Sequence, residues 1–358
     1  KGLLDWAREE LILPNPQYRE RERRGLWVGN TPKYLWLYRV DGSDLVVPTG
    51  VGKQVRQFLS KQDEIIVQLA DNGILEYQGN IPLYDYQKAA VEALKKSSCG
   101  ILQSPCGSGK TQMGIALAVM LERKTLWVTH TQDLLTQSKA RAEQYLPEES
   151  LGTITAGKVR IGSHVTFATV QTLSKLDLTQ YRNTWDVVIV DECHRLAGSP
   201  TQVTMFYKVM NNLAARYKYG LSATVHRSDG MIKSTFAVLG PIIYRVPDEA
   251  VADKTMQVRI VPRDTGIAVS RGCLDTDGTL DYHELLSYLG DNQERNELIV
   301  RDMVSQSGHS CLVLASRLEQ LRNIQKMLPE ELREVSAMID GSMTSKRGKA
   351  EREAVLED

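Results

Sequence analysis

The sequence predicts an α/β fold built on a parallel sheet, and three observations support this prediction. From Ile81 onward, short apolar runs alternate with stretches of helical spacing. One run is followed at 104–111 by a glycine-rich loop, Ser-Pro-Cys-Gly-Ser-Gly-Lys-Thr. Another run, Val-Val-Ile-Val at 187–190, ends in Asp191 and Glu192. Alternating strands and helices form parallel sheets that bind ligands at the carboxyl ends of their strands.

The first 80 residues are predicted to form a small α+β domain of their own. Residues 33–39 alternate with period two, which places Tyr34, Trp36 and Tyr38 on one face of a strand. Such a row either stacks on nucleic acid or packs in a core, and we predict a core role here. The neighbouring basic residues are Arg19, Arg21, Arg23 and Arg24.

Residues 47–54, Val-Pro-Thr-Gly-Val-Gly-Lys-Gln, imitate the glycine-rich loop. Gln54 occupies the position where a hydroxyl group would bind Mg²⁺. The apolar residues of this stretch follow Asp-Gly-Ser-Asp at 41–44, a pattern typical of a hairpin. We therefore predict a turn at 47–54 rather than a second nucleotide loop.

The alternating region at 81–248 is predicted to form the central domain. Its strand candidates are 100–103, 125–130, 164–170, 186–190 and 217–223, and its helix candidates are 86–96, 112–122, 132–146 and 201–214. Residues 249–358 are predicted to begin a second α/β unit, with strands at 258–261 and 310–315 and a surface excursion at 263–282.

Composition excludes several classes of protein. At 358 residues and 42% apolar content the chain can hold two or three domains, and no apolar run reaches the length of a membrane span. The formal net charge is zero, so nucleic-acid binding would depend on local basic patches. The five cysteines form no C-x-x-C pair and the start resembles no signal peptide, which predicts a cytoplasmic or nuclear protein with free thiols.

The loop at 104–111 has the composition of a phosphate-binding loop. Gly107 and Gly109 allow successive backbone N–H groups to converge on phosphate oxygens at the start of a helix. Lys110 would reach the β- and γ-phosphates, and Thr111 would bind Mg²⁺. Ser104 stands where the full pattern has its first glycine.

The acidic pair after 187–190 supplies the second half of a nucleotide-hydrolysis site. A buried strand that ends in two carboxylates has little structural purpose, because desolvating an unpaired charge is costly. Asp191 would hold Mg²⁺ through water, opposite Thr111. Glu192 would orient the attacking water or accept its proton.

Together these segments give residues 81–358 a resemblance to the superfamily 2 helicases of DExH type. The nearest branch is the XPB-type DNA helicases and translocases, with their bacterial and phage relatives. Residues 104–111 resemble motif I, Asp-Glu-Cys-His at 191–194 motif II, and Leu-Ser-Ala-Thr at 221–224 motif III. The resemblance implies a RecA-like domain at 81–248, an incomplete second one at 249–358, and ATP and Mg²⁺ as cofactors. It also suggests a bacterial or phage protein of the cytoplasm, or a nuclear one in a eukaryote.

The resemblance implies further site residues. Tyr-Asp-Tyr-Gln at 84–87 is similar to an adenine-reading motif, in which the Gln87 amide contacts the base; Tyr84 stands where the family often has arginine. Nucleotide contacts are thus expected from Gln87, Gly107, Ser108, Gly109, Lys110 and Thr111. Residues 128–135 and 168–173 resemble segments that hold a nucleic-acid backbone, which implicates Thr129, His130, Thr169, Gln171 and Thr172.

Other residues are expected to couple the two sites. His194 in motif II has this role in the family, and Ser222 and Thr224 could link the acidic pair to the nucleic-acid face. Residues 225–229 resemble an Arg-x-Asp element of the XPB-type branch, which adds Arg227 and Asp229.

The resemblance extends to Leu-Val-Leu-Ala-Ser-Arg at 312–317, similar to motif IV, and to 339–341. No stretch matches motif V or motif VI, which supplies arginines to the γ-phosphate in this superfamily. We therefore expect a truncated motor that binds ATP and hydrolyses it slowly.

The function that the sequence favours is an ATP-dependent helicase or double-stranded DNA translocase. A motor subunit of a restriction or defence system shares these motifs, although no nuclease cluster is recognisable. An ATP-gated nucleic-acid sensor that does not unwind is a third possibility. Double-stranded DNA is the expected partner, and RNA stays open because backbone contacts do not distinguish the sugar. No membrane contact is predicted, and the sequence leaves protein partners open.

Overall fold

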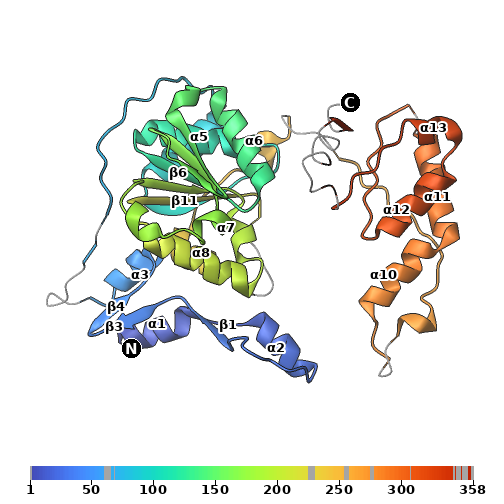
Figure 1. Ribbon diagram of the computed structural model, residues 1–358, viewed down its shortest axis with the longest axis horizontal. Helices are drawn as coiled ribbons and strands as arrows, with labels where there is room; N and C mark the ends of the chain where they lie inside the picture. The colour runs from blue at the N-terminus through green and yellow to red at the C-terminus, as the bar shows by residue number, and fades with distance from the viewer. Residues whose placement is uncertain are drawn as a thin grey trace. The chain divides into compact units, whose positions relative to one another are not determined.

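The computed structural model divides the chain into two compact units, Lys1–Gln257 and Val258–Asp358 (Figure 1). It describes residues 2–59, 66–67, 69–224, 230–253, 258–274, 278–306, 308–341, 343, 348 and 354–355. No helix in this part of the chain is long and apolar enough to cross a membrane.

Among the described residues of the first unit, eight strands form one sheet, in the order β12-β5-β11-β10-β6-β9-β7-β8. All neighbours pair parallel except β7 and β8, which confirms the predicted α/β class. The five strands predicted from sequence are present, and three others were missed. In chain order the strands are β5 (Cys99–Gln103), β6 (Thr125–Thr129), β7 (Leu151–Thr155), β8 (Lys158–Arg160), β9 (Val165–Thr169), β10 (Val187–Val190), β11 (Tyr217–Ser222) and β12 (Ile242–Arg245).

Helices cover both faces of this sheet, with α5 and α6 on one face and α7 and α8 on the other (Figure 1). The predicted helices are confirmed to within a few residues at their ends. Polar caps fix two helix starts, because the side chain of Thr131 accepts from the N–H of Leu134 and that of Ser199 from the N–H of Gln202. The helices are α4 (Asp85–Lys95), α5 (Lys110–Leu121), α6 (Gln132–Glu143), α7 (Val170–Leu173), α8 (Pro200–Asn212) and α9 (Ile232–Leu239), with 3₁₀ turns η2 (Glu148–Ser150), η3 (Leu178–Tyr181), η4 (Cys193–Ala197) and η5 (Asp248–Val251).

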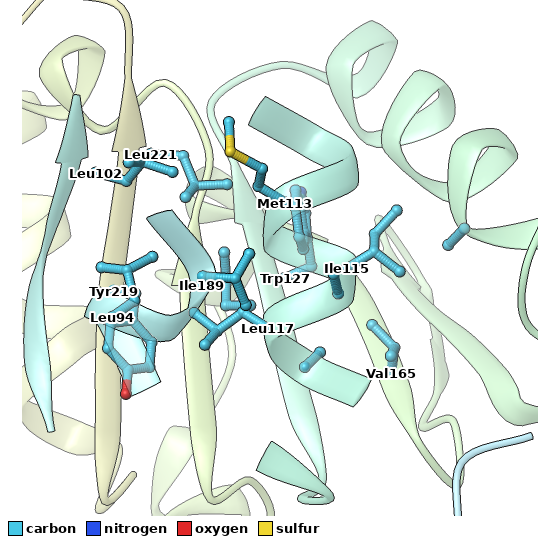
Figure 2. Close-up of a cluster of buried hydrophobic side chains, with 14 of the residues drawn as sticks. Leu94, Leu102, Met113, Ile115, Leu117, Trp127, Val165, Ile189, Tyr219 and Leu221 are labelled. Carbon is cyan, nitrogen blue, oxygen red and sulfur yellow. The ribbon is translucent and has the colours of Figure 1, made fainter. Parts of the chain in front are cut away.

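The core lies in two layers because successive strand residues point to opposite faces. Val187 and Ile189 join the cluster beneath α4 and α5, while Val188 and Val190 join the cluster beneath α8. Figure 2 shows the first cluster, in which Met113, Ile115 and Leu117 of α5 lie over Trp127 and its neighbours. A Cβ on Gly114 would lie 2.6 Å from the Trp127 ring, so α5 approaches the sheet at a distance that only glycine permits.

The N-terminal region packs onto the sheet domain within the first unit. Its buried side chains, among them Leu35 and Leu37, share a cluster with Ala197 of η4, Val203 of α8 and Ala237 of α9. The predicted divisions at residues 80 and 248 stay predictions. The elements of this region are α1 (Leu3–Glu10), β1 (Ile12–Pro14), α2 (Pro16–Arg23), β2 (Tyr34–Trp36), β3 (Arg39–Asp41), β4 (Asp44–Val46), η1 (Thr49–Val51) and α3 (Gly52–Arg56).

The predicted core role of the aromatic row is wrong for two of its three members. Trp36 and Tyr34 are exposed, and only Tyr38 is buried. Only one face of β2 is covered, and Leu35 occupies it, as does Leu37 just after the end of the strand. The aromatic side chains at 34 and 36 therefore face solvent.

The stretch at 47–54, predicted to be a turn, is helical over residues 49–54. It forms η1 and the first residues of α3, and it contacts the end of α9. A Cβ on Gly50 would lie 2.5 Å from the Ala237 carbonyl oxygen and 2.5 Å from the Gly240 nitrogen. This glycine therefore serves a close packing contact rather than a phosphate.

The described residues of the second unit form helices and no strand. They are η6 (Arg271–Cys273), α10 (Tyr282–Asp291), α11 (Gln293–Ser305), α12 (Leu318–Met327) and α13 (Glu330–Glu334). The predicted strands at 258–261 and 310–315 are wrong for this structure, because neither segment has a ladder partner here and Ile260, Leu312 and Leu314 are exposed. A partial second RecA-like domain stays a prediction.

Candidate active site

The glycine-rich loop connects the end of β5 to the start of α5. Gly107 and Gly109 have φ of 77° and 81°, in the left-handed region that favours glycine. A Cβ on Gly109 would also lie 2.5 Å from the Gln87 side-chain nitrogen. Both glycines that the sequence singled out are therefore required by the backbone path, and the loop leads directly into the helix N-terminus at Lys110.

Serine hydroxyls brace this loop from inside. The Ser104 hydroxyl donates to Ser108 Oγ at 2.6 Å, and the Ser108 hydroxyl donates to the Pro105 carbonyl at 2.7 Å. The Ser104 N–H also donates to the Ser222 carbonyl of β11 at 2.9 Å. The serine that replaces the first glycine of the pattern is thus a structural member of the loop, and a contact from the buried Ser108 side chain to a nucleotide stays a prediction.

Gln87 ties the start of α4 to the phosphate loop. Its Oε1 accepts from the Tyr84 N–H at 2.9 Å, and its Nε2 donates to the Ser108 carbonyl at 2.8 Å. The Tyr86 hydroxyl donates to the same carbonyl at 3.0 Å. Because Gln87 is buried and both ends of its amide contact backbone, adenine recognition by this side chain stays a prediction. The sequence did not predict the contact of Tyr86 with the loop, since only the folded loop brings Ser108 next to this residue.

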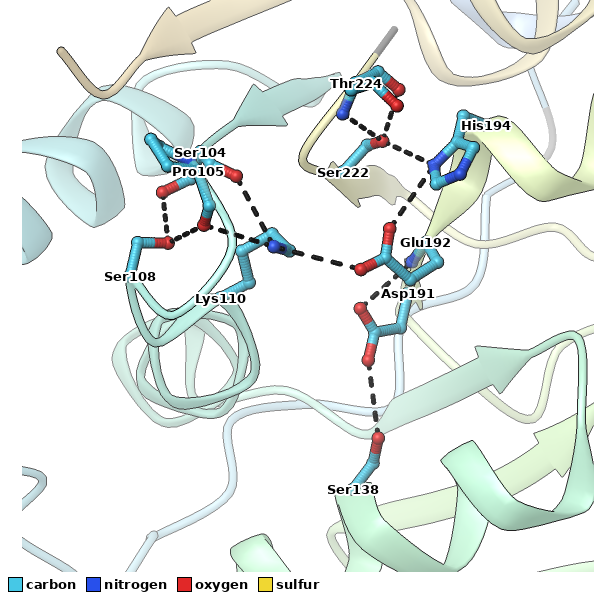
Figure 3. A network of polar contacts seen from close by, with 10 residues as sticks. All are labelled: Ser104, Pro105, Ser108, Lys110, Ser138, Asp191, Glu192, His194, Ser222 and Thr224. Atoms are coloured by element: carbon cyan, nitrogen blue, oxygen red, sulfur yellow. Dashed lines mark hydrogen bonds and ion pairs between the residues drawn. The ribbon is translucent and has the colours of Figure 1, made fainter. Parts of the chain in front are cut away.

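Lys110 lies between the loop and the acidic pair (Figure 3). Its Nζ lies 3.4 Å from the Ser104 carbonyl oxygen, 3.3 Å from the Pro105 carbonyl oxygen and 3.8 Å from Glu192 Oε1. An ammonium group held only by carbonyl oxygens and one carboxylate can exchange these partners for phosphate oxygens.

The two carboxylates of motif II differ in environment. Asp191 is buried, and its oxygens accept from the Glu192 N–H at 3.0 Å and from the Ser138 hydroxyl at 3.4 Å. Burial, followed by the charge of Glu192, raises the pKa of Asp191 to about 6. The hydrogen bond from His194 lowers the pKa of Glu192, and the charge of Lys110 adds to this effect against the opposing effect of burial. Glu192 also has φ of 46°, a left-handed conformation that is strained for a residue with a side chain.

A polar chain runs from Glu192 to motif III (Figure 3). His194 Nδ1 lies 3.3 Å from Glu192 Oε2 and 2.7 Å from the Ser222 hydroxyl oxygen. The Ser222 hydroxyl donates to the Thr224 carbonyl at 2.6 Å and accepts from the Thr224 N–H at 3.2 Å, which leaves one lone pair on its oxygen to accept a hydrogen bond from Nδ1–H. The structure thus brings His194, Ser222 and Thr224 together, while Arg227 and Asp229 lie outside the described residues.

The residues predicted to contact nucleic acid gather at the carboxyl ends of β6 and β9. These strands are neighbours, with Thr129 paired to Thr169. The side chain of Thr169 caps α7 and lies 2.9 Å from the Thr172 hydroxyl oxygen, and Gln171 donates to the His130 carbonyl at 2.9 Å. Their position at the sheet edge fits the prediction, although each of these polar contacts stays within the protein.

A cavity of about 360 Å³ lies between the loop and the acidic pair. The sequence did not identify its α6 wall, although Leu134, Gln137, Ser138 and Arg141 have the spacing of one helix face. Asp191 and Thr111 both line this cavity, and their oxygens fit Mg²⁺, which takes one or two protein oxygens along with substrate phosphates. The full lining is Gly107, Gly109, Lys110, Thr111, Gln112, Leu134, Gln137, Ser138, Arg141, Asp191 and Glu192.

Comparisons with known proteins find similarity in the region that holds this cavity. Residues 80–227 match the family model described as "Type III restriction enzyme, res subunit". The chain is 32% identical over 210 residues to the "DNA 3'-5' translocase XPB2" of Sulfurisphaera tokodaii, covering 56% of this chain and 44% of that protein. It is 28% identical over 267 residues to the "DNA 3'-5' helicase XPB" of Kineococcus radiotolerans, covering 69% and 44%.

Among solved structures, the crystal structure of the UvsW helicase from bacteriophage T4 is similar with a TM-score of 0.49 and 21% sequence identity. That similarity covers 67% of this chain and 92% of the other. The chain spans less than half the length of the two XPB proteins that it matches.

Proposed function

We propose that the region around residues 80–227 is a superfamily 2 helicase domain of XPB type, which the match to the restriction-subunit model and the similarity to the XPB2 translocase support. We further propose that this domain binds ATP with Mg²⁺ and uses hydrolysis to move along double-stranded DNA. The observation that carries the proposal is the meeting of Lys110, Asp191 and Glu192 around one cavity at the carboxyl edge of a parallel sheet. DNA rather than RNA is proposed because the two relatives named above are DNA translocases or helicases by name.

The phosphates would lie against the loop, where Gly107 and Gly109 open the backbone and the α5 N-terminus favours negative charge. Lys110 would exchange its loop carbonyl contacts for phosphate oxygens. Thr111 and Asp191 would hold Mg²⁺, which neutralises charge that develops on the phosphates. This arrangement also offsets the cost of burying the Asp191 carboxylate.

Glu192 is proposed to orient the attacking water and accept its proton. Its carboxylate is held on one side by Lys110 and on the other by His194, which favours the charged form that a general base requires. Through His194 the same carboxylate contacts Ser222 and Thr224. We propose that this row of polar contacts couples the nucleotide site to DNA and that Arg227 and Asp229 add to it. The DNA backbone is proposed to be held by Thr129, His130, Thr169, Gln171 and Thr172.

Turnover by the 358 residues alone is proposed to be slow. No stretch of this sequence matches the motif VI arginines that stabilise the transferring phosphoryl group, and such arginines contribute several powers of ten to the rate of related enzymes.

A second candidate is a motor subunit of a restriction system, which the name of the matching family model favours. ATP-dependent cleavage of plasmid DNA would support that candidate. Strand separation without cleavage would support the first, and ATP-dependent DNA binding without movement would support a sensor.

The first test is Mg²⁺-dependent ATP binding and hydrolysis by the 358-residue chain, with and without duplex DNA. We expect binding that Lys110→Ala abolishes, and binding without turnover in Glu192→Gln. Equal ATP affinity in the wild-type and Lys110→Ala chains would refute the site. Vigorous DNA-stimulated hydrolysis would refute slow turnover while leaving the site intact.

A further inference from the structure

The N-terminal region carries an unusual concentration of exposed aromatic surface. Trp27 and Trp36 are 84% and 56% exposed, whereas Trp127 and Trp185, within the sheet domain, are buried. Tyr34 is 43% exposed. Moving indole and phenol rings out of water lowers the free energy, so a group of them at a surface indicates a site of interaction.

The β1–β2 ribbon fixes the direction of two of these rings. Its antiparallel register places Trp36 opposite Ile12 and Tyr34 opposite Pro14 on one face. Leu35, the residue between them, lies on the other face and is buried. The Trp36 ring also contacts the Tyr38 ring, with centroids 5.6 Å apart, which holds the indole in place.

Positive charge gathers on the same elements. Residues 15–39 contain six basic side chains and two acidic ones, in a chain whose formal net charge is zero. The helix α2 carries three of the six, and a fourth, Arg24, follows its last residue. The helix buries none of its own residues and lies at the far end of the N-terminal region from α3 (Figure 1). The buried Asn15 caps α2 and donates to the Pro32 carbonyl at 2.7 Å, so helix and ribbon are held together.

The opposite face of the ribbon packs on the sheet domain. Leu35 and Leu37 share a buried cluster with Val203 and with Ala197, which is five residues beyond Glu192. A ligand on the exposed face would therefore be held at a fixed place relative to the sheet domain.

We infer that Tyr34, Trp36, Trp27 and the basic side chains of α2 form an aromatic platform that binds unpaired bases of single-stranded DNA. The rings would stack on bases, and the arginines would contact phosphates. Every base has a flat face that can stack on an aromatic ring, whereas paired bases inside a duplex hide theirs. The inference rests on the proposed function for DNA as the partner, and it adds the strand state that the N-terminal region recognises.

The test uses the full 358-residue chain and a fluorescein-labelled oligothymidylate of about 20 nucleotides, a length that exceeds the usual site size. Affinity is measured by anisotropy at several salt concentrations, beside a duplex of equal length. The variant is Trp27→Ala with Trp36→Ala. Tyr282→Ala, which removes an exposed aromatic ring of the second unit, is the matched control.

We expect the double variant to lose about tenfold or more in affinity for the single strand, with an unchanged salt dependence. Arg19→Ala with Arg23→Ala should reduce the slope of affinity against salt instead. The Tyr282→Ala chain should bind as wild type, and Trp36→Phe should retain most of the affinity. Oligothymidylate should quench tryptophan fluorescence in the wild-type chain and not in the double variant.

Wild-type affinity in the double variant would overturn the inference, as would an equal loss of affinity for duplex and single strand. ATP binding, measured in the same samples, separates the two proposals. Retained Lys110-dependent ATP binding with no effect of the tryptophans refutes the platform alone. Stacking without ATP binding refutes the proposed function and leaves the platform.

Discussion

The Gln87 side-chain amide donates to the Ser108 carbonyl at 2.8 Å and thereby connects α4 to the phosphate loop. Its other end accepts from the Tyr84 N–H. This side chain thus holds the loop in position, and it is not among the residues that line the cavity.

Replacing Gln87 by alanine should weaken the binding of all nucleoside triphosphates alike. The change removes two hydrogen bonds to the backbone, one of them buried, worth about 1–3 kcal/mol together, and loosens the loop that is proposed to bind the phosphates. Titration with ATP and GTP should show roughly tenfold losses for both. A loss confined to ATP would show that Gln87 instead reads the adenine base.

Replacing Asp191 by asparagine should stabilise the chain in metal-free buffer while abolishing hydrolysis. The pKa of Asp191 is raised by burial to about 6, so in the folded state the carboxyl holds its proton at pH values where the unfolded chain has released it. Stability therefore falls as pH rises from about 4 to 6, and the cost is fully present at pH 7.5. The variant should gain about 2 kcal/mol there by thermal unfolding in EDTA.

The same comparison at pH 5 is the control for this effect. The advantage of the Asp191→Asn chain should shrink as the native carboxyl becomes protonated. A constant advantage across this range would assign the gain to packing rather than to charge.

Because of Lys218, the free energy of unfolding should be larger in mildly alkaline solution than at neutral pH. It is buried in β11, where burial and then the charge of Arg182 lower the pKa of its ammonium group to about 8. Between this pH and the higher pKa of the unfolded chain, the unfolded state binds more protons, so stability rises with pH. The free energy of unfolding of the wild-type chain, relative to that of Lys218→Met, should increase between pH 7.5 and 9.5 in urea titrations.

The Lys218 ammonium also donates to the Met210 carbonyl at 3.0 Å, so the methionine variant has an offset in stability at every pH. Only the difference in slope between the two chains tests the shifted pKa. Parallel stability curves would contradict it.

Gly114→Ala should destabilise the sheet domain by about 1–3 kcal/mol, because overpacking forces α5 away from β6 and β11. The added Cβ would lie 2.6 Å from the Trp127 ring and 2.7 Å from a Leu221 methyl group. Gly52→Ala is the matched control, since that position is helical and a Cβ there meets nothing within 4 Å. Equal unfolding midpoints of the two variants would refute the tight approach of α5.

The sequence predicts the phosphate loop and the acidic pair because their chemistry is local. The positive φ of Gly107 and Gly109 and the buried strand before Asp191 depend on a few neighbouring residues. The partner of Gln87 and the cavity wall at Ser138 and Arg141 depend on which helices lie beside the loop. No short window of sequence contains that information.

The predictions for the aromatic row and for the strands of the second unit failed because they too depend on neighbours distant in sequence. Period two at 33–39 predicts two faces, but the sheet domain decides that the leucine face is the covered one. The segments at 258–261 and 310–315 have strand-like composition, and composition alone provides no neighbouring strand to pair with.

The cluster that joins Leu35 and Leu37 to Ala197, Val203 and Ala237 has a practical consequence for dissecting this protein. Cutting the chain near residue 80 to isolate the sheet domain would expose an apolar patch over η4, α8 and α9. The shortened protein would be prone to self-association, and its loss of activity would report on solubility as much as on catalysis. Point substitutions on the exposed side of β2 leave that patch covered. They are therefore the cleaner way to test the N-terminal region and the sheet domain separately.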